Sequence, residues 1–306
     1  MSNTSSKEQD KSNEELEEYW TEERRSNAQA KPMPVVPEEK TGEGGEDQEQ
    51  GNPVITPPNT SILSIRRLDP SNVSGRVVLK GKGFGLNPSA TPNVLAQPVS
   101  TPAAWPYSCN GKLFFSWKGS DYVGSAGSIY LEMLLTAGHN IYDDGEWSTN
   151  FLYYPGYPVY GKSWSWSRAA VFTAWQSGNF DYDYAMILTS SSMQEVGSMG
   201  SITGLSPTGL TWSAYGYPAA PPYPGNQMYV ATGSYVSGTS QITMNNNDMT
   251  QGSSGGNWLT NYSGQNCVNG VQSHRNSSQP TYAVSPYLNT NDFQTLLQCA
   301  ATGQCN

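Results

Sequence analysis

The sequence predicts an all-β protein of β-barrel architecture, with a partly disordered N-terminal segment and one short C-terminal helix. Many short runs of strand-forming residues are separated by Gly, Pro, Asn and Ser, and no helical period appears before residue 290. Many short strands followed by a single helix are typical of barrels. The predicted strands lie at residues 112–117, 128–136, 169–174, 185–189, 211–217, 228–232, 240–244 and 270–273, and the predicted helix lies at 290–299.

Residues 1–60 form an acidic segment of their own. They carry 6 Lys and Arg against 14 Asp and Glu, so a net charge of −8 out of the chain's −9 lies there. Ser12 and Glu15 have the spacing of a capping box, which predicts a helix over about residues 13–30. Residues 31–60 alternate Pro, Gly and acidic residues, so a disordered linker is predicted. The helix is either part of a pro-region that docks on the body or a plain acidic tail.

Residues 61–105 are a connecting segment of uncertain structure, and residues 106–306 form the predicted β-rich domain. The chain from residue 61 onward has no basic patch, which argues against nucleic acid as a partner. No run of about 18 apolar residues is present, so no membrane span is predicted. No apolar leader follows Met1, so no secretory signal is visible. The Gly-, Tyr- and Trp-rich body is still typical of secreted all-β proteins, so secretion and a cytoplasmic location both stay open.

Four cysteines, Cys109, Cys267, Cys299 and Cys305, are spread over the predicted domain. Their spacing to one another and to the histidines fits no zinc motif, so no metal is predicted. A Cys299–Cys305 disulfide would close a short local loop and leave Cys109–Cys267 as a long-range disulfide. The other pairings, and free buried thiols in a reducing compartment, stay open.

The candidate catalytic residues are His139, Asp183 and Ser254, with spacings of 44 and 71 residues. Acyl transfer to a serine needs a base beside its hydroxyl, a carboxylate that orients the base, and amide donors for the developing oxyanion. The order His, Asp, Ser differs from the orders found in subtilisins and α/β-hydrolases. Asp183 is preferred over Asp181 because an apolar run follows it and would bury the carboxylate.

The serine lies in the glycine-rich string Gly252-Ser253-Ser254-Gly255-Gly256. Glycine at position 252 permits a tight turn that aims the amides of Gly252 and Ser254 at one point, where they would form an oxyanion hole. His139 follows the apolar run 134–137, which would place it at the end of a strand.

Thr136-Ala137-Gly138-His139, Asp183-Tyr184-Ala185 and the serine string resemble the three signatures of chymotrypsin-like serine peptidases. Longer strings, such as Tyr215-Gly216-Tyr217-Pro218, resemble the microbial, glutamyl-endopeptidase-like branch of that family. The resemblance covers about residues 110–290 and, as a propeptide, loosely covers residues 15–35. It implies two six-stranded antiparallel β-barrels with the triad in the cleft between them, and endopeptidase activity without metal or cofactor. It also implies protein or peptide substrates, a docked pro-region, a monomer and secretion.

Two positions depart from the family pattern. Asn140 stands where a cysteine often follows the histidine, and the cysteine's usual partner near residues 125–127 is absent too, so that barrel lacks its usual disulfide. Ser253 replaces the aspartate that pairs with a newly cut N-terminus in the digestive enzymes. Any activation is therefore expected to rest on removal of the pro-region alone.

The residues that would choose the substrate are less clearly marked. Asp248 lies six residues before Ser254, where trypsin-like enzymes place the aspartate that selects Lys or Arg, although glutamyl-specific relatives also carry aspartate there. Gln272 stands near the position at which those relatives place a histidine that reads glutamate. The resemblance further implies that Ser273 borders the substrate cleft and hydrogen-bonds the triad carboxylate. His274 could line the same pocket or cap a surface loop.

Two other classes of function stay open. An inactive peptidase homologue would use the same fold to bind proteins without cleaving them. Alternatively, Trp164, Trp166 and Trp175 would form a carbohydrate-binding platform, although such aromatic residues are more often core or cross-strand pairs.

Overall fold

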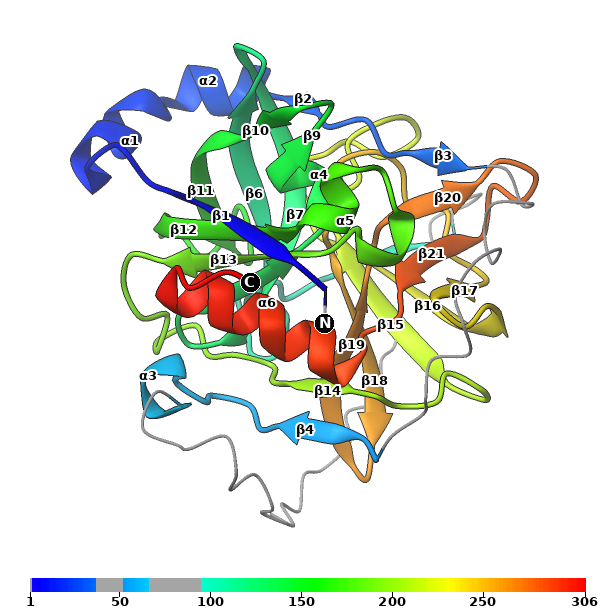
Figure 1. The fold of residues 1–306 in the computed structure, drawn as a ribbon. Coiled ribbons are helices and arrows are strands. Elements are labelled where there is room, and N and C mark those ends of the chain that lie inside the picture. The colour runs from blue at the N-terminus through cyan, green and yellow to red at the C-terminus, as the bar shows by residue number, and fades with distance from the viewer. Residues whose placement is uncertain (1, 37–51, 66–94) are drawn as a thin grey trace.

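A closed barrel and a second, curled sheet lie side by side in the protein (Figure 1). The structure, a computed structural model, describes residues 2–36, 52–65 and 95–306. The predicted all-β class with a C-terminal helix is confirmed.

The first half of the body is a six-stranded antiparallel barrel. Its strands pair in the order β6-β7-β8-β13-β12-β11, and β11 pairs back with β6 to close it. Side chains alternate between the two faces of a strand, so Leu113 and Phe115 pack in the main core while Phe114 points to the other side. Phe114 is buried as well, because Trp20 covers it with ring centroids 5.5 Å apart. The strands are β6 (Asn110–Trp117), β7 (Ser120–Tyr130), β8 (Met133–Thr136), β11 (Thr149–Pro155), β12 (Trp164–Phe172) and β13 (Ala185–Thr189).

The second half is a sheet with the strand order β20-β21-β17-β16-β15-β18-β19. The strand predicted at 270–273 is interrupted, because the chain changes partner there. Val271 pairs with Asn257 of β18, whereas His274 pairs with Val284 of β21. The strands are β15 (Thr211–Gly216), β16 (Tyr229–Ser237), β17 (Gln241–Met244), β18 (Asn257–Tyr262), β19 (Gln265–Val271), β20 (His274–Asn276) and β21 (Ala283–Pro286).

The C-terminal helix α6 (Thr290–Thr302) packs against β12 and β13 of the barrel. The side chain of Asn289 caps its first turn, and Gly303 ends it in the left-handed conformation that glycine adopts without strain. The helix is three residues longer than predicted, and a Cys299–Cys305 disulfide closes the turn after it. None of the helices in the described ranges is long and apolar enough to span a bilayer.

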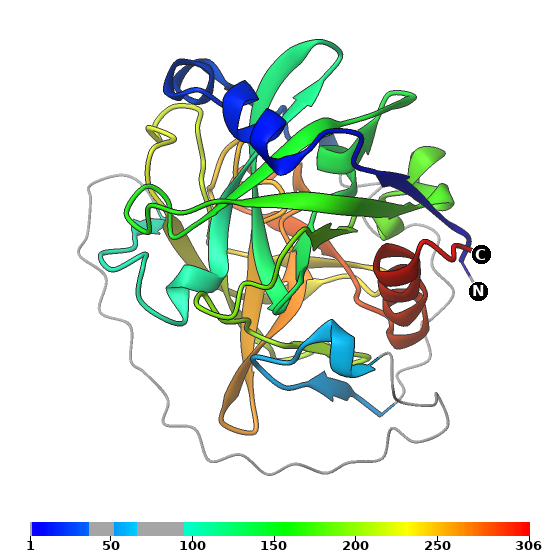
Figure 2. The same ribbon diagram turned by 90° about the vertical axis from the view of Figure 1, so that its left-hand side faces the viewer.

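The N-terminal segment lies on the outside of the barrel, next to the C-terminus (Figure 2). β1 (Thr4–Glu8) pairs antiparallel with β12, and two short helices follow, α1 (Asn13–Tyr19) and α2 (Glu22–Asn27). The predicted capping box of Ser12 and Glu15 starts α1, but the single helix predicted over 13–30 is wrong. The helix stops because the side chain of Trp20 turns inward and donates Nε1–H to the carbonyl of Asn150 at 2.6 Å.

The prediction of a disordered linker over residues 31–60 is wrong for its two ends, while residues 37–51 lie outside the described chain. The ends are ordered because their backbones hydrogen-bond to sheet edges. β2 (Gln29–Ala30) runs parallel to β7, and β3 (Val35–Val36) runs parallel to β20. β4 (Val54–Thr56) pairs antiparallel with β14 (Ser201–Thr203), which itself extends the second sheet beyond β19.

The connecting segment predicted over residues 61–105 contains two short elements, and its residues 66–94 lie outside the described chain. These elements are the helix α3 and the strand β5, and β5 pairs antiparallel with β16. The remaining short elements are α3 (Ile62–Ile65), β5 (Gln97–Pro98), η2 (Tyr107–Cys109), α4 (Gly138–Ile141), β9 (Tyr142–Asp143), β10 (Glu146–Trp147), α5 (Thr173–Gln176) and η3 (Phe180–Tyr182).

Candidate active site

His139 lies on the one-turn helix α4, directly after strand β8. The glycine before it is required by close packing. A Cβ atom at Gly138 would lie 2.9 Å from the indole of Trp175 and 3.0 Å from a carboxylate oxygen of Asp183. This close approach places the buried imidazole beside the Asp183 carboxylate.

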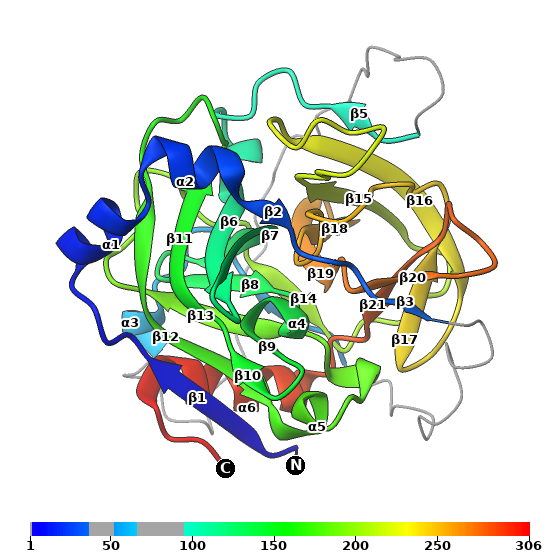
Figure 3. The same ribbon diagram turned by 90° about the horizontal axis from the view of Figure 1, so that it is seen from above.

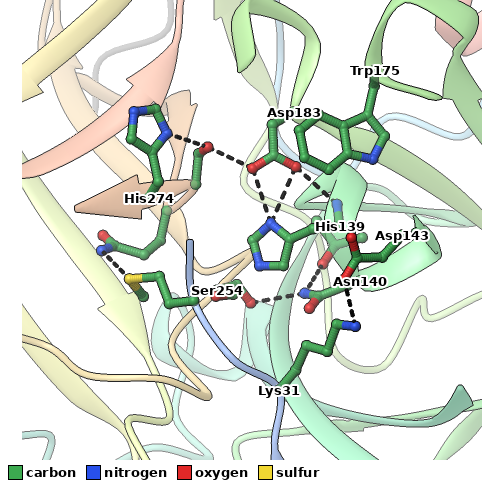
Figure 4. A network of polar contacts seen from close by, with 12 residues as sticks. Lys31, His139, Asn140, Asp143, Trp175, Asp183, Ser254 and His274 are labelled. Atoms are coloured by element: carbon green, nitrogen blue, oxygen red, sulfur yellow. Dashed lines mark hydrogen bonds and ion pairs between the residues drawn. The ribbon is translucent and has the colours of Figure 1, made fainter. Parts of the chain in front are cut away.

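Asp183 and His139 are in direct contact (Figure 4). The imidazole Nδ1 lies 2.9 Å from Oδ2 and 3.1 Å from Oδ1, and the backbone amide of His139 donates to Oδ1 at 2.8 Å. Because the carboxylate is an acceptor, it holds the proton on Nδ1 and leaves the Nε2 lone pair free to act as a base. The other candidate, Asp181, instead accepts hydrogen bonds from Ser240 and Gln241.

Ser254 lies in the turn between β17 and β18, on the opposite side of the His139 ring from Asp183 (Figure 4). Within the described part of the chain, neither Ser254 Oγ nor His139 Nε2 has a hydrogen-bond partner. The predicted base and nucleophile therefore face each other without a formed hydrogen bond. Such bonds are often long in free enzymes and tighten when substrate binds.

The turn that carries the serine leaves two backbone amides free. Gly252 has φ +92°, and a Cβ atom there would lie 2.7 Å from the carbonyl oxygen of Tyr217, so only glycine fits. The amides of Gly252 and Ser254 donate to no acceptor among the described residues. Two unpaired donors beside a serine hydroxyl are what a developing oxyanion needs.

Asn140 connects the histidine helix to the serine turn, a role that the sequence analysis missed. Its Nδ2 donates to the carbonyl of Ser254 at 2.9 Å and to the hydroxyl of Thr136 at 3.0 Å. The amide of Ser125 in β7 donates to the same Ser254 carbonyl at 2.8 Å. The available signal was an amide side chain directly after His139 and before Ile141.

Ser273 and His274 continue the polar chain behind Asp183. The Ser273 hydroxyl donates to Asp183 Oδ2 at 2.5 Å, as the resemblance implied, and lies 2.8 Å from Nδ1 of His274. Since its one proton goes to the carboxylate, Nδ1 of His274 is the donor in the second contact. Burial lowers the pKa of His274 to about 4, so its ring is neutral at neutral pH. His274 therefore lies buried behind the carboxylate rather than in a surface loop.

Asp248 does not offer a free carboxylate to a substrate. Its Oδ2 accepts from the amide of Leu95 at 2.9 Å. Its Oδ1 accepts from the amide of Ala96 at 3.0 Å and from the hydroxyl of Tyr223 at 2.5 Å. The Asp248 carboxylate therefore holds residues 95 and 96, which precede β5, by hydrogen bonds.

An Asp248→Asn variant is expected to lose about 1–3 kcal/mol of unfolding free energy, because one of its two oxygens becomes an NH₂ group facing donors. The cleavage preference is expected to stay unchanged. Urea unfolding and cleavage of a peptide library followed by mass spectrometry measure the two effects. A lost preference for Lys or Arg would instead make Asp248 a specificity residue.

Gln272 is buried and held by its neighbours. Its Oε1 accepts from Asn247 Nδ2 at 3.0 Å and from Trp258 Nε1 at 3.1 Å. Its backbone donates to the carbonyl of Gly256 and accepts from the amide of Gly255. The side-chain amide is therefore fixed directly beside the serine turn, with its NH₂ group pointing away from both donors.

The remaining candidates have structural roles. Cys109 and Cys267 are buried thiols, whose pKa values burial raises to about 12 and about 11. Trp164, Trp166 and Trp175 are buried against the barrel core and do not form a surface platform. No group of three or more His, Cys, Asp or Glu side chains in the described chain is placed to hold a metal ion.

Three solved structures that share this fold are a protease, a serine protease and a Glu endopeptidase. Protease Anisep from Arthrobacter nicotinovorans is 29% identical, with a TM-score of 0.59 over 65% of this chain and 99% of that one. The thermostable serine protease AL20 from an extremophilic microorganism is 27% identical, with a TM-score of 0.58 over 64% and 98%. A Glu endopeptidase is 21% identical, with a TM-score of 0.59 over 69% and 99%. No family model matches the sequence, and no curated protein is similar to it.

Proposed function

Because the chain has the chymotrypsin-like serine peptidase fold, we propose that it is a serine endopeptidase that uses His139, Asp183 and Ser254. The contact of 2.9 Å between His139 Nδ1 and Asp183 carries the proposal, because it leaves Nε2 as a base on the side of the ring that faces Ser254. Protein and peptide chains are the proposed substrates.

The proposed reaction has two halves. Ser254 Oγ attacks the carbonyl carbon of the scissile peptide bond while His139 Nε2 takes the hydroxyl proton. The amides of Gly252 and Ser254 donate to the oxyanion, and Asp183 stabilises the imidazolium. The C–N bond then breaks as His139 returns the proton to the leaving amine, which gives an acyl-enzyme. In the second half a water molecule takes the place of the amine, and hydrolysis restores the serine.

A fluorophosphonate probe tests this proposal without knowledge of the natural substrate. We expect the full chain to acquire one covalent adduct, mapped by mass spectrometry to Ser254 and absent from Ser254→Ala. The matched control is Ser253→Ala, because the Ser253 hydroxyl donates to the carbonyl of Thr250 and is not free to react. An adduct at Ser253, or undiminished proteolysis by Ser254→Ala, would contradict the mechanism.

A protein-binding homologue without activity is the second candidate. It is favoured by the burial of the two central side chains, because Ser254 is 0% exposed and His139 is 1% exposed. Reaction of Ser254 with the probe excludes it. If Ser254 does not react even when Met33, which packs against Gln272 beside the serine turn, is replaced by Ala, a binding homologue explains the protein better.

We further propose that the protein is secreted and monomeric. The disulfide between Cys299 and Cys305 supports secretion, since disulfides persist mainly in oxidising compartments. Mass spectrometry of alkylated protein from the culture medium and from cell extract tests the location.

A further inference from the structure

Residues 29–36, here called the crossing segment, run from the barrel to the second sheet (Figure 3). At one end β2 is parallel to β7, with Ala30 opposite Val123, and at the other end β3 is parallel to β20, with Val36 opposite Asn276. Further backbone hydrogen bonds join Lys31 to Val123 at 3.0 Å and Arg275 to the carbonyl of Pro34 at 3.1 Å. The four residues between the two strands therefore bridge the two halves of the protein.

The bridge crosses directly over the proposed catalytic residues. Val123 lies two residues before Ser125, which donates to the carbonyl of Ser254. Arg275 lies two residues after Ser273, which donates to Asp183. In Figure 4 the pale blue ribbon of the segment runs from Lys31 past Ser254. Ser254 and His139 are both buried next to this bridge.

Met33 is the side chain by which the crossing segment contacts Gln272, the neighbour of the serine turn. It is 7% exposed, and its Sδ lies 3.9 Å from Nε2 of Gln272. Because the backbone of Gln272 is hydrogen-bonded to Gly255 and Gly256, Met33 packs against a residue that directly adjoins the serine turn. Gln272 is uncharged, so this position suits a long, uncharged side chain.

Lys31 anchors the barrel end of the crossing segment. Its Nζ lies 2.7 Å from an Asp143 oxygen and 3.2 Å from the ring centroid of Trp117, and the side chain is buried. A buried ammonium that is paired with both a carboxylate and an aromatic face is held firmly. The crossing segment is thus fastened by side chains on both sides of Ser254.

The crossing segment is not bound as a peptide about to be cut. A scissile peptide must place its carbonyl oxygen within hydrogen-bond distance of the oxyanion donors. Among the described residues, the amides of Gly252 and Ser254 donate to no carbonyl of the crossing segment. Ser254 Oγ has no hydrogen-bond partner in the segment either. The segment therefore occupies the site without presenting a bond to the nucleophile.

We propose that the crossing segment is a built-in inhibitor, with Met33 in the position that receives the substrate side chain. This inference rests on the proposed peptidase function. It gives the N-terminal segment a regulatory role, in which Ser254 reacts slowly until residues 31–34 leave the site.

The test compares the full chain with Met33→Ala and Lys31→Ala, which loosen the segment at different anchors. We expect the fluorophosphonate to react with Ser254 at least about tenfold faster in each variant. Truncating a buried side chain of this size shifts the equilibrium between the bound and the released segment by more than that factor. The matched control is Val35→Ala, since the Val35 side chain is 62% exposed and makes none of the proposed contacts. It is expected to react as slowly as the unaltered chain.

Two more measurements separate the possible failures. Hydrogen exchange of residues 29–36 is expected to accelerate in Met33→Ala. A synthetic peptide of residues 29–36 is expected to slow the reaction of the fluorophosphonate with Ser254 in this variant. The same peptide with Ala in place of Met33 is expected to leave that reaction unchanged. Equal reaction rates in all four chains, with casein cleaved by each, would overturn the inhibitor and leave the peptidase standing. Faster exchange with no reaction of Ser254 would overturn the peptidase itself.

Discussion

Replacing Asp183 by Asn is expected to lower kcat about 10⁴-fold, measured with a peptide substrate in the Met33→Ala background. The carboxylate accepts from Nδ1 and the backbone amide of His139 and from the hydroxyl of Ser273. An amide side chain has one acceptor oxygen, and its NH₂ group favours the imidazole tautomer with the proton on Nε2. That tautomer cannot take the proton of Ser254.

The matched control for this loss is Asp181→Asn. Asp181 lies two residues away, and its carboxylate accepts from Ser240 and Gln241 without contact to His139. Its kcat is expected to stay within a factor of a few of the parent. A similar loss in both variants, or no loss in Asp183→Asn, would remove Asp183 from the proposed triad.

Replacing Gly252 by Ala is expected to lower kcat by about 10²- to 10³-fold, the usual effect of losing one oxyanion donor. At φ +92° an added Cβ is strained, and it would also meet the Tyr217 carbonyl at 2.7 Å. The turn must shift to relieve this contact, and the Gly252 amide shifts with it. Peptide turnover in the Met33→Ala background measures the effect.

Gly209→Ala separates backbone strain from the loss of a donor. Gly209 has φ +78°, but apart from Gly209 and its two chain neighbours no described atom lies within 4 Å of the position that its Cβ would take. This variant is expected to lose about 1–2 kcal/mol of unfolding free energy and to keep its kcat. An equal loss of kcat in both variants would mean that Gly252 acts only through stability.

The sequence predicts part of the barrel, because short strands leave a local pattern. The predicted strand 128–136 is divided between the end of β7 and β8, and β11 was not predicted. The strand at 185–189 has its predicted bounds, and His139 and Asp183 meet as their places after β8 and before β13 suggest. The choice between Asp181 and Asp183 also follows from the apolar run after the second residue.

The sequence fails where order comes from distant partners. Residues 31–36 contain two prolines and show no periodicity, so nothing local indicates that the edges of β7 and β20 hold them in place. Asp248 has the spacing of a specificity residue, but its carboxylate turns toward the segment at 95–96. Likewise, the long-range disulfide considered for Cys109 and Cys267 does not form, and both thiols are buried.

The outward face of β6 is shielded from water by the N-terminal segment. Phe114 shares a buried cluster with Val123, Leu152 and the indole of Trp20. A chain cleaved after its N-terminal helices would lose the Trp20 indole, and Phe114 would become part of an exposed apolar patch. Removal of the N-terminal helices is therefore expected to lower the solubility of the remaining chain.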